Sequence, residues 1–242
     1  MSEESARAIE QKTIGQFENL DWFRSKKGRI SASIAKECCG QGNPAAKIKK
    51  VITVGKVGGK GRGPHMAYGI EHEDIAAEMF EQKLKAENHE VNLRKCGLFI
   101  SIENPVLAAS PDRVGTIDGE EVVVEIKCLS ASRDTDPKSA ATKKQKDSNF
   151  AFRLIDNQLQ VKQNHRYFFQ VQMQMAVSRR QHAYMVIFTN ESTPVEYTKV
   201  PFDEEFWAET QQKLLDFHSQ YILPALILQR FGAQQLSNSD SN

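Results

Sequence analysis

A hairpin predicted between residues 112 and 128 brings two carboxylates and a lysine together. The dipeptide Asp118-Gly119 separates two apolar-rich runs there and is typical of a two-residue type I′ turn. With that turn in place, Asp112 lies opposite Glu125 on the neighbouring strand. Lys127 follows two residues beyond Glu125, and because side chains alternate along a strand it points to the same face. The pattern predicts that two acids and an amine converge at one end of the hairpin.

This combination of groups suits metal-assisted hydrolysis. Two carboxylates held this closely repel each other, and their pKa values rise unless a cation lies between them. A hard divalent ion with oxygen ligands is the simplest such cation. The alternative is a solvated hairpin with scattered charges. The run Val122-Val-Val-Glu-Ile-Lys127 favours the metal interpretation, because it reads as a buried central strand in which charges need partners.

A third acid is predicted from the helical periodicity between about residues 66 and 86. At about 100° per residue, Glu73 lies on the apolar stripe that contains Ala76, Phe80 and Leu84. Glu71 lies on the opposite side of this helix and is expected in solvent. We therefore expect Glu73, and not Glu71, to point inward. The alternative for Glu73 is a half-exposed acid near a helix start, where it complements the helix dipole.

A second predicted helix, over residues 164–178, carries a polar stripe. Gln163, Gln170 and Gln174 share one side of this helix, and apolar residues such as Val171 and Met175 share another. An uncharged amide that faces inward can position water or a phosphate without changing the charge around a metal. A structural glutamine that only forms hydrogen bonds fits the pattern equally well.

The elements that must position these residues form a mixed α/β pattern. The chain has 242 residues, 40 % of them apolar and 26 % charged, a composition that excludes fibrous and disordered classes. Its length fits one large domain, which we place at residues 21–231, after an N-terminal segment at 1–20 and before a disordered polar tail at 232–242. Periodicity predicts helices near 34–51, 66–86, 164–178 and from 203, with Pro224 kinking or ending the last, and further strands near 97–101, 106–109, 183–189 and 195–200.

The distribution of charge along the chain is more informative about possible phosphate contacts than the net charge, which is only +1. No acid occurs between Glu37 and Glu71, whereas that stretch contains Lys47, Lys49, Lys50, Lys56, Lys60 and Arg62. A second basic run contains Lys143, Lys144 and Lys146. Basic segments of this kind suit phosphate contacts, although a merely solvated surface explains each run equally well. The glycine-rich part, residues 55–63, satisfies no nucleotide-binding motif and is predicted to be a flexible basic loop.

Other features of the chain exclude several classes. The longest aliphatic stretch, residues 221–228, contains Pro224 and is far shorter than the ~20 apolar residues of a membrane span. The start of the chain resembles neither a signal peptide nor a transit peptide, so we expect an intracellular protein, cytoplasmic or nuclear depending on the host, with no membrane partner. The cysteines lack the spacing of a zinc or iron–sulfur site and are expected as reduced thiols: Cys38, Cys39, Cys96 and Cys128.

These residues also resemble a known family. Pro111-Asp112, followed after twelve residues by Glu125-Ile126-Lys127, resembles the PD-(D/E)xK nuclease signature. The flanking blocks resemble the YqaJ-type viral recombinase, or phage lambda exonuclease-like, family. In order along the chain, they are Lys26-Lys-Gly-Arg-Ile-Ser-Ala-Ser33, Gly69-Ile-Glu-His-Glu73, Ser110-Pro-Asp112 and Phe169-Gln-Val-Gln172. The resemblance extends from about Trp22 to Thr189.

The resemblance implies a restriction-endonuclease-like α/β fold, with a central mixed β-sheet flanked by helices. It implies a Mg²⁺-dependent nuclease in which Mn²⁺ substitutes, with the catalytic set Glu73, Asp112, Glu125, Lys127 and Gln170. The Ile126 carbonyl is implied as a further metal ligand beside Glu73, Asp112 and Glu125. Residues implied to hold a terminal 5′-phosphate are Ser33, Ser110 and Arg133, together with Lys26 or Arg29. Arg113, where many members have Gly, and Lys26, where they have Arg, depart from the family pattern.

The implied activity is 5′-to-3′ exonucleolytic digestion of linear double-stranded DNA. The resemblance also implies a ring-shaped homotrimer and a single-strand-annealing recombinase as partner. A site-specific or structure-specific endonuclease on the same fold is the alternative among enzymes, because fold and metal site do not determine where the cut falls. The alternative outside enzymes is a non-catalytic DNA-end-binding recombination module. Such a module is expected to lose an acid or the lysine, and this chain retains them all.

Overall fold

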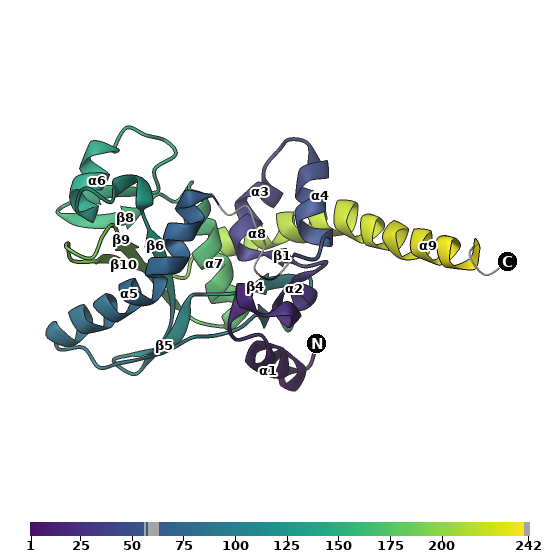
Figure 1. Ribbon diagram of the computed structural model, residues 1–242, viewed down its shortest axis with the longest axis horizontal. Helices are drawn as coiled ribbons and strands as arrows, with labels where there is room; N and C mark the ends of the chain where they lie inside the picture. The colour runs from purple at the N-terminus through teal and green to yellow at the C-terminus, as the bar shows by residue number, and fades with distance from the viewer. Residues whose placement is uncertain (56, 58–62, 240–242) are drawn as a thin grey trace.

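The centre of the computed structural model, which describes residues 1–55, 57 and 63–239, is a five-stranded sheet (Figure 1). Its strand order is β10-β9-β6-β5-β2. The strands are β2 Val91–Arg94, β5 Arg113–Ile117, β6 Glu120–Cys128, β9 His182–Phe188 and β10 Glu196–Pro201. β6 pairs with β9 in parallel, and the other pairs are antiparallel. The sheet is therefore mixed, as predicted.

The β5–β6 hairpin has the predicted register. Ile117 is paired with Glu120 and Arg113 with Val124 across the turn. Asp118 and Gly119 have φ of 52° and 78°, as the type I′ turn requires. β6 lies between two neighbouring strands, and its residues 122–126 are all buried. Asp112 thus lies just before the paired part of the hairpin.

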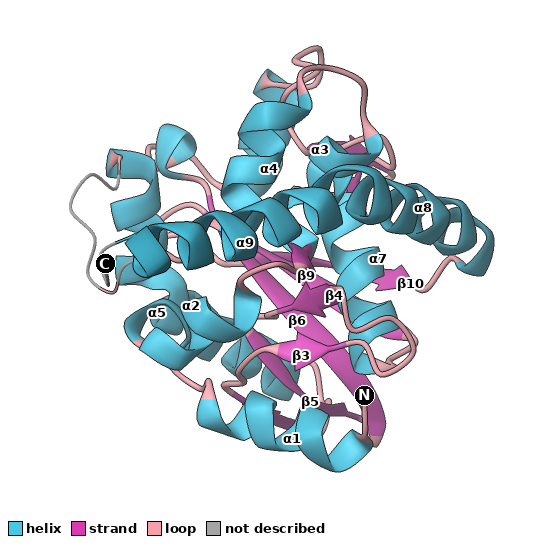
Figure 2. Ribbon diagram, turned by 90° about the vertical axis from the view of Figure 1, so that its right-hand side faces the viewer, coloured by secondary structure: helices cyan, strands magenta, loops and turns pink. Residues whose placement is uncertain are grey.

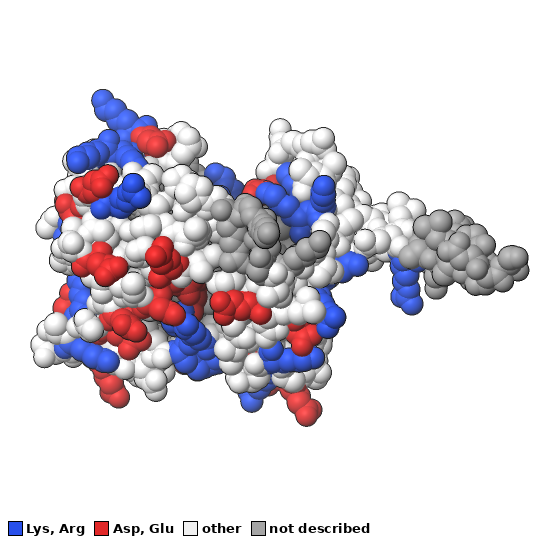
Figure 3. Space-filling view, in the orientation of Figure 1, with Lys and Arg blue, Asp and Glu red and all other residues white. Residues whose placement is uncertain are grey.

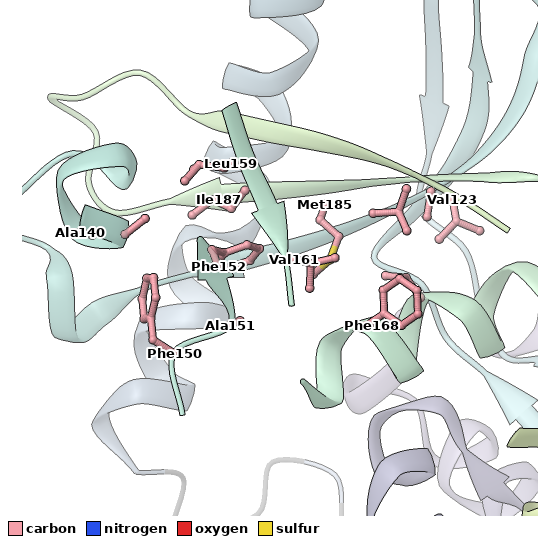
Figure 4. Packing of buried hydrophobic residues seen from close by; sticks show 14 of the residues in the cluster. Val123, Ala140, Phe150, Ala151, Phe152, Leu159, Val161, Phe168, Met185 and Ile187 are labelled. Atoms are coloured by element: carbon pink, nitrogen blue, oxygen red, sulfur yellow. The ribbon is translucent and has the colours of Figure 1, made fainter. Parts of the chain in front are cut away.

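Two long helices cover the opposite faces of this sheet. α5 Pro64–Ala86 packs its apolar side on Val122, Val124 and Ile126 of β6. α7 Arg166–Ser178 packs on the other face, where Val123 and Met185 point. Figure 4 shows Phe168 of α7 close to Val123 and Met185 in this second layer. Odd-numbered residues of β6, among them Glu125 and Lys127, therefore face α7.

A smaller sheet lies on the far side of α7. Its order is β1-β4-β3, with β1 Ile30–Ser31, β3 Phe99–Ile100 and β4 Leu107–Ala109. α7 contacts both sheets, so most of its residues are buried, including Gln172 and Gln174. The remaining strands form a separate hairpin, β7 Phe152–Ile155 and β8 Gln158–Val161, which sequence periodicity missed. Its turn residues Asp156 and Asn157 have φ of 48° and 60°, a second type I′ signal in the sequence.

The predicted helix over residues 34–51 is wrong in one respect, because two helices occupy this stretch. α3 Ala35–Cys39 and α4 Pro44–Ile52 follow a 3₁₀ turn at Ala32–Ile34. Between them, Gly42 has φ of 111°, and Asn43 accepts a hydrogen bond from the Ala45 N–H as the cap of α4. Gly40 ends α3 in an extended conformation, the left-handed Gly42 turns the chain, and Pro44 favours the start of α4.

The C-terminal helical region also differs from expectation. α8 Glu204–Phe217 leads through a π-helical turn, His218–Ile222, into α9 Leu223–Ser239 (Figure 2). Pro224 thus follows a local distortion and does not end the helical region, since its missing N–H is tolerated in the first turn. The backbone remains helical to Ser239, and the disordered tail expected at 232–242 stays a prediction. Good helix formers follow Gly232 and explain the extension.

The first twenty residues pack on the core and support the hairpin. They contain α1 Glu3–Lys12, a 3₁₀ turn at Gln16–Glu18 and the start of α2 Leu20–Lys26. The Gln16 side-chain amide donates hydrogen bonds to the carbonyls of Cys96 and Pro111, directly before Asp112. The other helical elements are α6 Pro137–Lys143 and a 3₁₀ turn at Ser130–Ser132.

Two predictions fall partly outside the described residues. Of the basic loop expected at 55–63, residues 56 and 58–62 are not described, and neither are residues 240–242 of the tail. Within the described ranges, no helix has the length and apolar character needed to cross a membrane.

Candidate active site

Glu125 is the hub of a hydrogen-bonded cluster at the end of β6. It is only 3 % exposed, and both of its carboxylate oxygens have partners. Oε1 accepts hydrogen bonds from Lys127 Nζ at 2.5 Å and Gln170 Nε2 at 2.6 Å, and Oε2 accepts one from Gln174 Nε2 at 2.6 Å. A buried carboxylate held by three donors has a single defined orientation.

Lys127 lies beside Glu125 and beneath an aromatic ring. Its Nζ is 4.2 Å from the ring centre of Tyr167 and 3.3 Å from Gln170 Oε1. Burial disfavours the ammonium, but the charges of Glu125, Tyr167 and Asp112 together with the hydrogen bond to Glu125 outweigh this effect and raise the pKa of Lys127 to about 12. Lys127 is therefore a fixed cation in this arrangement and acts as a hydrogen-bond donor.

Asp112 contacts the backbone of the neighbouring strand. Its Oδ2 accepts a hydrogen bond from the Ile126 N–H at 2.6 Å. Burial, followed by the nearby charges of Glu125 and Glu73, raises the pKa of Asp112 well above its usual range. The predicted pair of acids is thus present, and the region holds more negative charge than Lys127 alone compensates.

Glu73 points inward from α5, as its helical phase predicted, while the side chain of Glu71 is 75 % exposed. Burial raises the pKa of Glu73, and the guanidinium of Arg113 opposes that rise. Arg113 Nη1 donates to Glu73 Oε1 at 3.0 Å and to the Asp112 carbonyl at 2.6 Å, and its Nη2 pairs with Asp74. Arg113, a departure from the family pattern, therefore holds Glu73 against the start of β5.

Two further glutamines of α7 are buried, and they differ in role. Gln172 donates to the Pro201 carbonyl and accepts from the Asp203 N–H, so it only ties α7 to the β10–α8 connection. Gln174 holds Glu125, and its own Oε1 is buried without a hydrogen-bond partner. Gln174 was absent from the predicted set, although it shares the polar stripe of Gln170, a signal that could have identified it.

The residues implied to bind a 5′-phosphate are only partly brought together. Ser33 lines the cleft above the acids, and Ser110 accepts a hydrogen bond from Trp22 Nε1, which belongs to the same cleft wall. Lys26 Nζ lies 4.3 Å from the ring centre of Trp22, and burial lowers the pKa of Lys26 to about 8. Ser110 and Lys26 therefore both contact Trp22, and Ser33 lines the cleft directly.

The two arginines of that set lie elsewhere. Arg29 donates from Nε to the Pro105 carbonyl at 2.9 Å and from Nη1 to the Ser25 carbonyl at 2.5 Å. It braces two backbone segments because their carbonyls offer the partners that a half-buried guanidinium needs. Arg133 is exposed beyond the end of β6 and does not line the cleft.

The cleft that contains these groups has a volume of about 810 Å³. Its floor is the end of the hairpin, and its walls come from the α1–α2 region, from α5 and from the start of α7. Figure 3 shows acidic side chains gathered over the region of α5. Aromatic and apolar side chains also line the walls: Phe17, Trp22, Phe23, Met66 and Ile70.

The donor chemistry of this floor fits a hard divalent cation. Glu73, Asp112, Glu125 and the Ile126 carbonyl offer oxygen atoms only, and the raised pKa of Asp112 reflects its burial and then the nearby charges of Glu125 and Glu73. In the described part of the chain, no three His, Cys, Asp or Glu side chains are arranged as a finished metal site. Here Lys127 and the two amides occupy the oxygens of Glu125, and Arg113 occupies Glu73.

The fold is shared with known exonucleases. An alkaline exonuclease from Laribacter hongkongensis superposes with a TM-score of 0.63 and 19 % identity, covering 89 % of this chain and 98 % of that one. A protein called SOX, solved in complex with DNA, has a TM-score of 0.59 and 14 % identity, and the match covers 90 % of this chain and 70 % of that one. A phage-related exonuclease from Haemophilus somnus has a TM-score of 0.51 and 12 % identity, and the match covers 83 % of this chain and 96 % of that one. These similarities confirm the predicted restriction-endonuclease-like fold.

Sequence comparison identifies the family directly. No curated protein matches the chain as a whole. The profile of the YqaJ-like viral recombinase domain, however, matches residues 21–181, which contain every member of the cluster around Glu125. The chain therefore belongs to the YqaJ-like viral recombinase domain family.

Proposed function

We propose that this protein is a metal-dependent deoxyribonuclease that hydrolyses phosphodiester bonds from the 5′-ends of linear duplex DNA. The convergence of Asp112, Glu125 and Lys127 at the buried end of one hairpin carries this proposal. Family membership supports it, as does the shared fold with proteins described as exonucleases and with one that was solved on DNA.

The residues at the cleft floor would hold the metal. Asp112, Glu125 and the Ile126 carbonyl are the proposed ligands. Glu73 would either bind the metal directly or, while paired with Arg113, contribute to the electrostatic field around it. The bound Mg²⁺, or Mn²⁺ in its place, would lower the pKa of a water and stabilise charge that develops on the phosphate.

Lys127 and Gln170 would position the attacking water. Because its pKa lies near 12 beside Glu125, the Lys127 ammonium donates a hydrogen bond and stabilises negative charge. Gln170 offers an amide that touches both Lys127 and Glu125. Gln174 holds the other oxygen of Glu125 and thereby keeps the carboxylate oriented. A homotrimer and a single-strand-annealing partner remain proposals from the family resemblance.

The first test separates exonuclease from endonuclease. With Mg²⁺ or Mn²⁺ we expect the protein to release label from linear duplex DNA and to leave covalently closed circles intact, whereas Ca²⁺ should permit binding without turnover. Gel analysis of both substrates, with EDTA as the control, measures this. Undiminished cleavage in EDTA would refute metal dependence, and nicking of the circles would favour the endonuclease alternative.

A second prediction concerns the choice of a 5′-phosphorylated end. Lys26 has a pKa of about 8, so it is protonated below that pH and loses its charge above it. We expect the preference for 5′-phosphate over 5′-hydroxyl ends to weaken as pH rises through about 8. Lys26→Arg should abolish this pH dependence, because a guanidinium stays charged throughout. The ratio of initial rates on the two ends, measured from pH 7 to pH 9.5, provides the readout.

Arg133→Ala is the comparison variant for that experiment, because Arg133 belongs to the implied phosphate-binding set but is exposed and does not line the cleft. It tests whether this guanidinium also contributes to the preference. If Arg133→Ala removed the preference and Lys26→Arg left its pH dependence unchanged, the terminal phosphate would bind at the end of β6 and not beside Trp22.

A further inference from the structure

A second cavity adjoins the candidate active site. It has a volume of about 760 Å³ and lies between the α3–α4 connection and the segment of residues 148–151. Arg166 and Tyr167, at the start of α7, line both this cavity and the catalytic cleft. The two spaces are therefore neighbours, and the first turn of α7 lines both of them.

The cavity collects positive charge from distant parts of the sequence. Lys36, Lys47 and Arg166 line it, and the Lys143–Lys146 run ends just before its wall at Ser148. Its one lining acid, Glu37, is paired with Lys50 at 2.6 Å. Figure 3 shows Lys and Arg side chains over α6 and over α4, on the two sides of this region. Of the two basic runs identified in the sequence, the first thus contributes Lys47 to the lining, and the second ends two residues before the lining residue Ser148.

The lining cations are held in place at the rim. Lys36 Nζ donates to the Asn164 carbonyl at 2.5 Å, directly before α7, and Lys47 Nζ donates to the Gly40 carbonyl at 2.7 Å. An ammonium with one backbone partner retains further N–H donors for an anion. Two fixed ammonium groups and one exposed guanidinium therefore surround the cavity without a carboxylate to neutralise them.

The same cavity offers aromatic surfaces. Tyr167 and His165 lie edge to face with ring centres 4.6 Å apart, and the largely buried Phe150, with Lys144 Nζ 5.5 Å from its ring centre, also lines the cavity. Positive charge beside aromatic rings is the combination that binds unpaired nucleic acid strands, whose bases stack on such rings. A space of this volume can hold a small ligand or a short strand segment.

We propose that this cavity binds the unpaired nucleotides of the DNA strand that is being hydrolysed, adjacent to the scissile phosphate. Lys36, Lys47 and Arg166 contact the phosphates, and Tyr167 presents its ring to a base. The inference rests on the proposed nuclease function. It assigns a DNA-binding role to Lys47 of the first basic run, which does not line the catalytic cleft.

The test is binding of a fluorescently labelled single-stranded oligonucleotide to the full chain in Ca²⁺, over a range of salt concentrations. Each phosphate contact contributes about 0.7 to the slope of log affinity against log salt for single strands. The double variant Lys36→Gln/Lys47→Gln should therefore lower the slope by about 1.4. Lys49→Gln, an exposed lysine on α4 outside the cavity, should leave the slope unchanged.

Three outcomes would overturn the inference. An unchanged slope in the double variant would assign both lysines to solvent. An equal loss in Lys49→Gln would mean that a general basic surface, and not the cavity, binds the strand. A loss confined to duplex probes would place duplex DNA there. Melting temperatures verify that each variant is folded, and hydrolysis of linear DNA by the wild type tests the proposed function separately.

Discussion

Asp112→Asn is expected to abolish DNA hydrolysis and, in the absence of metal, to raise the melting temperature of the protein. The loss of activity follows from the loss of a charged oxygen ligand at the proposed metal position. A metal contributes several kcal/mol of transition-state stabilisation, so the rate should fall on the order of 10³-fold or more.

The gain in stability follows from the raised pKa of Asp112. A carboxyl whose pKa is higher in the folded state binds its proton more tightly there than in the unfolded chain. As pH rises from the unfolded-state pKa towards the raised folded-state pKa, ionisation of Asp112 therefore lowers the stability of the metal-free fold. Asparagine removes the charge and retains an oxygen that can accept the Ile126 N–H.

Thermal melts in EDTA at pH 7 to 8, with single-turnover hydrolysis in Mg²⁺, measure both effects. Glu71→Gln is the matched control, because it removes an exposed acid of α5 and should change neither quantity appreciably. A lower melting temperature for Asp112→Asn in EDTA would show that the ionised carboxylate stabilises the metal-free fold. Retained hydrolysis would exclude Asp112 as a ligand.

Lys127→Met is expected to lower the rate of hydrolysis by about 10²- to 10³-fold, the usual cost of removing one positioned hydrogen-bond donor from a site where negative charge develops. Methionine retains the length of the side chain and removes the charge. The variant should also be destabilised without metal, because Glu125 is 3 % exposed and loses its only cationic partner among the described residues. Breaking a buried ion pair from one side costs about 3–5 kcal/mol, and the amides of Gln170 and Gln174 reduce that cost.

Divalent metal should restore part of the lost stability, because it supplies a cation to the same carboxylate. The measurement is the melting temperature with EDTA and with Ca²⁺, together with the rate in Mg²⁺. Lys85→Met, an exposed lysine of α5, is the control. A rate within threefold of wild type would remove Lys127 from the proposed chemistry, and an equal melting temperature in EDTA would show that the two amides alone sustain Glu125.

Local sequence rules determined the central part of the site. The Asp118-Gly119 turn and the two-residue alternation of the strands set the hairpin register, which the structure confirms from Ile117 to Arg113. The helical phase separated Glu73 from Glu71 correctly, because the apolar stripe of α5 can face only the sheet. Both patterns depend on neighbours within one element or one tight turn, so the sequence alone contains the information.

Other parts of the site depend on which elements meet, and only the tertiary structure decided them. Arg113 pairs with Glu73 because α5 crosses the start of β5, and Gln174 reaches Glu125 because α7 is buried between two sheets. Arg29 belongs to a family-like block, yet its guanidinium braces the backbone at Ser25 and Pro105. The direction of a long side chain follows from partners distant in sequence, and neither periodicity nor spacing encodes those partners.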